Sequence, residues 1–136
     1  MATDELDVQR HIAEGCNRFG GYGFKNNNKF LAGIPDLFLS SKKHGPMMIE
    51  VKLLKGTESA TGVSPIQVST MKKLKAAGCA TGLLAVRRLD VGRWSIYASR
   101  NPEKYFIDND FQKWVKERGQ SWPVEEIMDY FKGEKV

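Results

Sequence analysis

Two short apolar stretches joined by a polar turn constrain the fold of this chain more than any other feature of its sequence. The first covers residues 33–40 and the second residues 48–52, and in both of them apolar side chains alternate along the chain, which is typical of β-strands. The connecting residues 41–46 are mostly polar and include a glycine and a proline, which favour a turn. The sequence therefore predicts a β-hairpin.

The register of this hairpin decides which acidic side chains meet. If Ser41 lies opposite Gly45, three residues form the loop and Asp36 falls on the partner strand's Glu50. A four-residue loop would move Asp36 along by one position, and a bulge would be needed to bring the two acids together. Side chains two positions apart on a strand share a face, so Lys52 points the same way as Glu50. The first register gathers two carboxylates and an ammonium at one place.

Such a cluster has an evident use in metal chemistry. Neighbouring carboxylates repel, and both stay ionised only if a positive charge lies between them. Mg²⁺ is usually held by one or two carboxylates together with a substrate phosphate, so Asp36 and Glu50 are candidate ligands. Lys52 is placed to orient or deprotonate a water and to offset charge that builds on a phosphate. The alternative is a surface hairpin whose acidic side chains are simply solvated.

Length and composition are typical of one soluble domain that binds an anionic partner. The 136 residues suit a single domain with a modest core, which we expect to span residues 1–136. The net charge is +5 and the pI is about 9.2, which favours binding of an anion such as nucleic acid. An excess of basic residues does not by itself indicate any one function.

The sequence shows no sign of a membrane or secretory location. The longest apolar runs, such as residues 83–86, are too short to span a bilayer, and the first residues lack a secretory signal. Cys16 and Cys79 have neither a Cys-x-x-Cys spacing nor a histidine partner, so we expect free thiols. Together these features predict a cytoplasmic protein.

Pro35-Asp36, followed by Glu50-Val51-Lys52, resembles the signature of the PD-(D/E)xK nucleases. With its surroundings, the chain resembles the VRR-NUC group of that superfamily, especially the small stand-alone members of phage and bacterial origin. The resemblance covers about residues 5–86. It implies an α/β fold with a restriction-endonuclease-like core, in which a mixed central β-sheet is flanked by helices.

The resemblance also implies a chemistry and a substrate. Asp36, Glu50 and the backbone carbonyl of Val51 would hold Mg²⁺ or Mn²⁺, and Lys52 would position or activate the attacking hydroxide. Small members of the group act on four-way junctions as homodimers, so branched DNA is the implied substrate and a homodimer the implied assembly.

The first helix is expected over residues 3–18, and it contains one more acidic residue that is a candidate for the metal site. Its apolar side chains recur at helical spacing on one face, which consists of Val8, Ile12, Cys16 and Phe19. Glu5 falls within the same arc, and burying an unpaired carboxylate is costly. The resemblance implies that Glu5 approaches the metal. The alternative is a solvated first turn, where Glu5 favours the helix dipole.

Several basic residues are candidate contacts to DNA phosphates. Lys25 and Gly33 match positions that precede the acidic motif in the resembling family, but the Ser-Pro-Gly common between them is replaced here by asparagines. Lys29 lies in that loop, and Lys72 and Arg87 lie further along the chain. Each could contact a phosphate oxygen, and each could equally be an ordinary solvated side chain.

A second helix begins at a strong signal. Ser64 is a good N-cap, Pro65 suits the first helical position, and Gln67 completes a capping box. In the resembling group this glutamine lies near the active centre, a role compatible with capping. Residues 81–86 then predict a covered strand, and the strand–helix–strand succession implies a right-handed crossover between parallel strands.

We expect the core of the domain to cover about residues 4–98, and the residues after it to form an extension. Residues 93–97 alternate as an edge strand, and residues 101–132 are interpreted as a helical C-terminal extension. Two apolar faces support that interpretation, one formed by Phe111, Trp114 and Val115, the other by Val124, Ile127, Met128 and Phe131. We expect them to pack in the core or in a dimer.

Together the residues and the resemblance predict a metal-dependent endonuclease that hydrolyses DNA phosphodiesters, with selectivity for four-way junctions or other branched DNA. One alternative is a non-catalytic DNA-binding protein that retains the nuclease fold and contacts phosphates through its basic residues. A third hypothesis is a structural or partner protein whose aromatic tail forms the interface.

Overall fold

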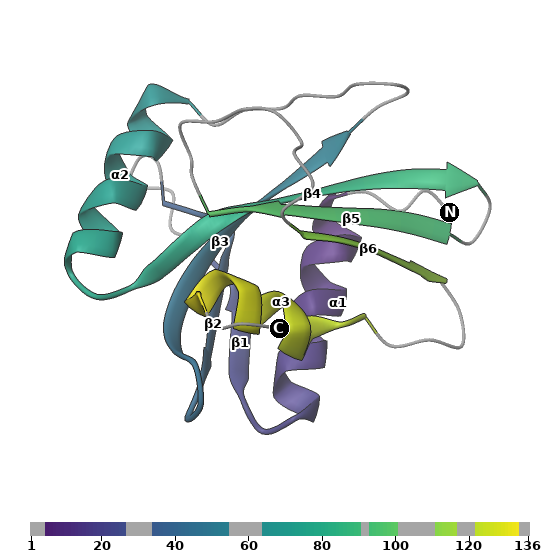
Figure 1. The fold of residues 1–136 in the computed structure, drawn as a ribbon, viewed down its shortest axis with the longest axis horizontal. Coiled ribbons are helices and arrows are strands. Elements are labelled where there is room, and N and C mark those ends of the chain that lie inside the picture. Colours follow the sequence, from purple (N-terminus) through teal and green to yellow (C-terminus); the bar gives the residue numbers. More distant parts are fainter. Residues whose placement is uncertain are drawn as a thin grey trace.

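A mixed six-stranded β-sheet organises the chain, with its strands in sequence order from β1 to β6 (Figure 1). The computed structural model describes residues 5–26, 34–54, 64–90, 93–100, 111–116 and 122–133. The strands are β1 (Tyr22–Lys25), β2 (Leu37–Ser41), β3 (Gly45–Leu54), β4 (Ala80–Asp90), β5 (Arg93–Ser99) and β6 (Phe111–Lys116), and the helices are α1 (Glu5–Arg18), α2 (Pro65–Ala76) and α3 (Val124–Lys132).

The β2–β3 hairpin adopts the first of the two registers considered above. Ser41 pairs with Gly45 and Leu37 pairs with Ile49, so the loop contains three residues. Gly45 has φ of 70°, a left-handed conformation that glycine adopts without steric cost. The residue before Leu37 is Asp36, which therefore adjoins Glu50 across the hairpin.

The predicted crossover is also present. Strands β3 and β4 are parallel and connected through α2, and Glu50 pairs with Leu83. Helix α2 begins with a complete capping box, in which the Ser64 side chain accepts a hydrogen bond from the Gln67 backbone and the Gln67 side chain accepts one from the Ser64 backbone. Capping satisfies two backbone N–H groups that the first helical turn leaves without partners, and this fixes where α2 starts.

The helices cover opposite faces of the sheet. Helices α1 and α3 share one buried cluster with alternate strand residues, which includes Val8, Ile12, Leu37, Ile49, Leu84, Ile96, Ile127 and Met128. On the other face, α2 packs Met71 and Val68 against Leu83. Adjacent strand residues point to opposite faces, so Glu50, the partner of Leu83, lies on the α2 side.

Two predictions for the C-terminal part are wrong. Residues 111–116, interpreted as helical, form strand β6, and β5 therefore lies between β4 and β6 and is not an edge strand. The apolar spacing of this segment suits a helix, but the N–H and C=O groups along one side of β5 need partners, and antiparallel pairing with β6 supplies them.

The last helix was predicted correctly and belongs to the central packing. Val124, Ile127, Met128 and Phe131 of α3 are buried, and Met128 contacts Cys16 of α1, with 3.8 Å between the two sulfur atoms. Both cysteines are free thiols, Cys16 buried and Cys79 half-buried. Among the described helices, none is long and apolar enough to cross a membrane.

Candidate active site

The acidic residues predicted to meet lie together at the end of the hairpin. Asp36 immediately precedes β2, and its Oδ2 accepts a hydrogen bond from the backbone N–H of Val51 at 3.1 Å. This bond anchors the Asp36 carboxylate beside the residue that follows Glu50. The three-residue loop of the hairpin is the local cause, because it sets the register that aligns the two strands.

Glu50 is buried, with 3% of its surface exposed, and its two carboxylate oxygens have different surroundings. Oε2 accepts a hydrogen bond from Gln67 Nε2 at 2.9 Å and forms an ion pair with Lys52 Nζ at 3.3 Å. Oε1 is also buried but has no hydrogen-bond partner in the described part of the chain. A buried carboxylate oxygen without a partner is costly, so this atom favours a further contact with a positive or hydrogen-bond-donating group.

The pKa of Glu50 also indicates that its surroundings contain too little positive charge to offset its burial and the nearby Asp36. Burial raises the pKa of Glu50, and the nearby Asp36 carboxylate raises it further. The Lys52 ammonium and the Gln67 amide act in the opposite direction but do not offset these effects. One additional positive charge near both carboxylates would favour the ionised form of Glu50.

The donor set fits a divalent cation with oxygen ligands. Asp36 and Glu50 offer carboxylates, and Val51, the residue after Glu50, offers a backbone carbonyl. The residues that the structure describes contain no group of three His, Cys, Asp or Glu side chains able to hold a metal. Mg²⁺ keeps several waters and commonly uses one or two carboxylates, which suits this set.

Gln67 connects the start of α2 to the acidic pair. Its Oε1 accepts a hydrogen bond from the Ser64 backbone at 2.8 Å, while its Nε2 donates to Glu50. The side chain therefore caps the helix and orients the carboxylate at the same time. The capping contact was predicted from the sequence, whereas the hydrogen bond to Glu50 was not.

The remaining candidate residues whose side chains the structure describes lie on β1, α2 and β4. Lys25 is exposed at the end of β1, and the next residue, Asn26, donates a backbone hydrogen bond to Asp36 O at 2.7 Å. Lys72 is exposed on α2, and the Arg87 guanidinium lies 5.9 Å from the ring centre of Tyr97.

Other residues predicted from the sequence to belong to the site lie in parts that the structure does not describe. Lys29 and Gly33 lie outside the described residues, as does the side chain of Glu5, whose backbone begins α1. The roles of these residues, and the phosphate contacts of Lys25, Lys72 and Arg87, stay predictions.

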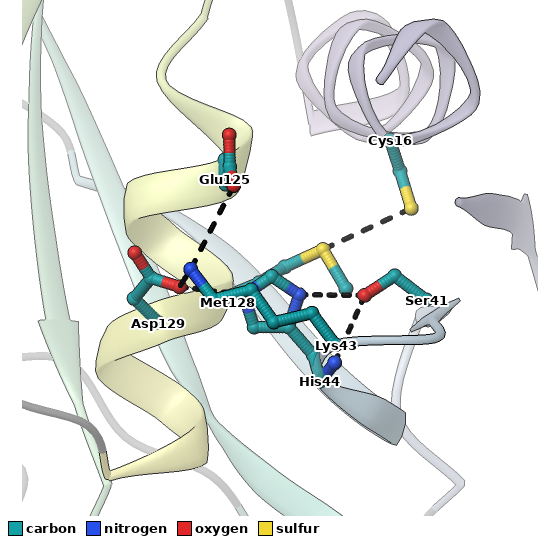
Figure 2. A network of polar contacts seen from close by, with 7 residues as sticks. All are labelled: Cys16, Ser41, Lys43, His44, Glu125, Met128 and Asp129. Carbon is teal, nitrogen blue, oxygen red and sulfur yellow. Dashed lines mark hydrogen bonds and ion pairs between the residues drawn. The ribbon is translucent and has the colours of Figure 1, made fainter. Parts of the chain in front are cut away.

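A second polar cluster lies at the other end of the hairpin and was not anticipated from the sequence (Figure 2). His44 is buried, and its two ring nitrogens lie 2.6 Å from Ser41 Oγ and 2.6 Å from Asp129 Oδ1. Lys43 Nζ lies 3.3 Å from the same Asp129 oxygen and 3.8 Å from Glu125. We call Ser41, Lys43, His44 and Asp129 the turn cluster.

The turn cluster joins the hairpin loop to α3. Partial burial acts to raise the pKa of Asp129, but hydrogen bonds from His44 and Lys43 outweigh that effect, and the pKa is lowered. Ser41 Oγ also accepts from the His44 backbone N–H at 3.0 Å, as serine side chains in turns do. His44 and Asp129 are 85 positions apart in the chain, so no sequence spacing connects them.

A solved structure has the same fold. The Holliday junction resolvase Hjc of Archaeoglobus fulgidus, an archaeal hyperthermophile, superposes with a TM-score of 0.57 over 91% of this chain and 98% of its own, at 16% sequence identity. No family model and no curated protein matches the sequence. The chain has an α/β, restriction-endonuclease-like fold, as predicted, and the likeness extends beyond residues 5–86.

Proposed function

We propose that this protein is a metal-dependent endonuclease that hydrolyses DNA phosphodiesters, with selectivity for branched DNA such as four-way junctions. The observation that carries the proposal is the buried Oε1 of Glu50, which has no partner among the described residues while Asp36 and Lys52 lie beside it. The likeness in fold to a Holliday junction resolvase supports the choice of substrate.

The residues of the site have distinct proposed roles. Asp36, Glu50 and the Val51 carbonyl would hold Mg²⁺ or Mn²⁺, with Glu5 as a further candidate ligand. A divalent cation held there would supply Lewis-acid stabilisation of the negative charge that develops on the phosphate. Gln67 fixes the orientation of the Glu50 carboxylate through its amide.

Lys52 is the proposed catalytic ammonium. It lies on the same face of β3 as Glu50, and 29% of its side chain is exposed, so it is accessible to water and substrate. Its charge would orient the attacking water and stabilise the additional negative charge on the phosphate. Its ion pair with Glu50 holds the ammonium at the carboxylates.

The finer assignments follow from the sequence motif. Pro35-Asp36 and Glu50-Val51-Lys52, taken with their surroundings, support membership of the VRR-NUC group, and with it a homodimer. The free thiols of Cys16 and Cys79 favour a cytoplasmic location. Lys25, Lys29, Lys72 and Arg87 are the proposed phosphate contacts. One domain of this size offers little surface for reading bases, which favours recognition of DNA shape over sequence.

A cleavage panel tests the proposal. Labelled four-way junctions, flaps, nicked duplexes and linear duplexes are incubated with Mg²⁺, Mn²⁺ or EDTA, using the wild type and Asp36→Ala. We expect wild-type cleavage of a branched substrate with a divalent cation, none with EDTA, and junction binding without cleavage for Asp36→Ala. Binding of DNA without cleavage under any cation would favour the non-catalytic alternative, and absence of both would refute the proposal.

A further inference from the structure

A basic cavity opens where β3 and β4 begin, away from the candidate active site. Its volume is about 330 Å³, and it lies between the end of α2, the beginning of β4 and the end of α3. Three cationic side chains line it, each from a different segment: Lys75 from α2, Arg100 from the residue after β5, and Lys132 from α3. Among the described residues, the lining contains no carboxylate.

Two contacts fix the character of this cavity. The Arg100 guanidinium stacks over the ring of Tyr130, 4.7 Å from its centre, which holds a normally flexible side chain in place. His44, which belongs to the turn cluster, forms part of the wall. The part of the wall that contains His44 is therefore held to α3 through the bond from His44 to Asp129.

A buried hydroxyl adds a second and independent observation. Thr81 lines the cavity with 3% of its surface exposed, and its Oγ1 has no hydrogen-bond partner in the described part of the chain. A buried hydroxyl without a partner is costly in a native protein. An oxygen-rich anion can accept from a hydroxyl and from ammonium and guanidinium groups together.

The position of the cavity relative to the candidate active site suits an extended polyanion. Pro46 lines the cavity and Glu50 belongs to the same strand, and four residues of strand span roughly 13 Å. Each strand of duplex DNA carries one phosphate for about every 3.4 Å of helix axis. A duplex with one phosphate at Glu50 has other phosphates at the distance of the cavity.

We propose that the cavity lined by Lys75, Thr81, Arg100 and Lys132 is a second phosphate site, which binds a backbone phosphodiester of the nucleic acid away from the cleaved bond. The proposal rests on the proposed function in one respect, the identity of the polyanion. The site contributes affinity and orientation and takes no part in bond cleavage.

Amide chemical shifts measured by NMR without metal test the site directly. The ¹⁵N-labelled protein is titrated with inorganic phosphate and, separately, with a short junction DNA. We expect both ligands to shift the amides of Gly78, Thr81 and Gly133, and the shifts to be lost in Arg100→Gln/Lys132→Gln. If neither ligand moves these amides, there is no phosphate site. If phosphate moves them and DNA does not, the assignment to a nucleic-acid backbone is wrong.

A matched pair of variants measures the contribution to DNA binding. Arg100→Gln/Lys132→Gln removes two charges from the cavity, and Arg18→Gln/Lys42→Gln removes one arginine and one lysine that are exposed elsewhere. In EDTA, we expect the cavity variant to bind junction DNA about tenfold more weakly, with a salt dependence smaller by roughly one unit of log–log slope. The control should change much less, and equal losses in the two variants would refute the proposal.

Thr81→Val separates a ligand-binding role from a structural one. The substitution removes a hydroxyl that has no described partner, so we expect a thermal midpoint no lower than that of the wild type, with weaker phosphate shifts. Unchanged phosphate shifts would remove Thr81 from the site. A protein whose cavity binds DNA but which cuts none would refute the proposed nuclease function and leave this inference standing.

Discussion

The two polar clusters at opposite ends of the β2–β3 hairpin contain similar groups, but the pKa of a carboxyl group is lowered in one cluster and raised in the other. In the turn cluster, both nitrogens of His44 have partners, and hydrogen bonds lower the pKa of Asp129. In the candidate site, burial and Asp36 raise the pKa of Glu50, and one of its oxygens has no described partner. In each cluster, nevertheless, a carboxylate forms an ion pair with a lysine of the β2–β3 hairpin, Lys43 in one and Lys52 in the other.

The difference indicates what each cluster is for. A polar network whose members satisfy one another stabilises the fold and needs no external ligand. A buried carboxylate that its neighbours leave partly unsatisfied costs stability, and such strained or unsatisfied groups concentrate at functional sites. The turn cluster therefore fastens α3 to the hairpin, whereas the unsatisfied oxygen of Glu50 is consistent with the metal-binding role proposed for its cluster.

The largest expected effect is on catalysis, and it should separate the two clusters completely. Lys52→Ala removes the proposed catalytic ammonium, so we expect cleavage to fall by roughly 10²- to 10⁴-fold with little change in junction binding. Lys43→Ala, the matched lysine of the turn cluster, should cleave at the wild-type rate. Single-turnover cleavage measures both, and an equal loss in the two variants would contradict the assignment of functions.

The next effect is on stability, in the opposite cluster. His44→Ala removes a buried ring and leaves Asp129 without its principal partner, so we expect unfolding to become easier by about 2–4 kcal/mol. Urea denaturation followed by circular dichroism measures the change. Lys43→Ala, whose side chain is about half exposed, should cost less than about 1 kcal/mol. A His44→Ala protein as stable as the wild type would show that the turn cluster does not fasten α3.

Smaller effects should follow pH with opposite signs in the two clusters. The raised pKa of Glu50 means that stability falls as pH rises through that pKa, so Glu50→Gln should stabilise the metal-free protein at neutral pH and hardly at all in acid. Added Mg²⁺ should raise the thermal midpoint of the wild type more than that of Glu50→Gln. Exposed Glu14→Gln serves as the control.

Asp129 should behave in the reverse manner. Its lowered pKa contributes stability that is present above the pKa of an unfolded aspartate and is lost as pH falls through the lower folded value. Asp129→Asn should therefore be less stable than the wild type at neutral pH, with the difference shrinking in strong acid. Thermal midpoints recorded across pH for both carboxyl variants test the contrast, which fails if the two profiles run in parallel.

The smallest expected effect concerns the link between α2 and Glu50. Ser64→Ala removes only the side-chain cap and should cost about 1 kcal/mol of stability. Gln67→Ala removes part of the same cap together with the hydrogen bond to Glu50, so we expect a similar loss of stability and, in addition, a fall in cleavage of about tenfold. Equal cleavage by the two variants would restrict Gln67 to capping.

Local chemistry explains why much of the fold could be predicted. The loop at Gly45 set the hairpin register, and the Ser64–Gln67 capping box set the start of α2. The contact between Asp36 and the residues around Glu50 follows from that register, since pairing in a hairpin depends only on nearby residues. Whether these groups perform the proposed chemistry is left to the cleavage panel.

Long-range pairing explains what could not be predicted. The segment Phe111–Lys116 has a spacing compatible with a helix, and only the presence of β5 beside it made a strand the better solution. The bond between His44 and Asp129 and the meeting of Lys75, Arg100 and Lys132 around one cavity join segments far apart in the chain. The sequence by itself determined the hairpin and the capped helix, because each depends on short-range geometry, and it left two registers, of which the structure has the one that brings Asp36 beside Glu50. Only the tertiary structure decided which distant groups became partners and which, like Glu50 Oε1, have none in the described part of the chain, because burial depends on the whole packed chain.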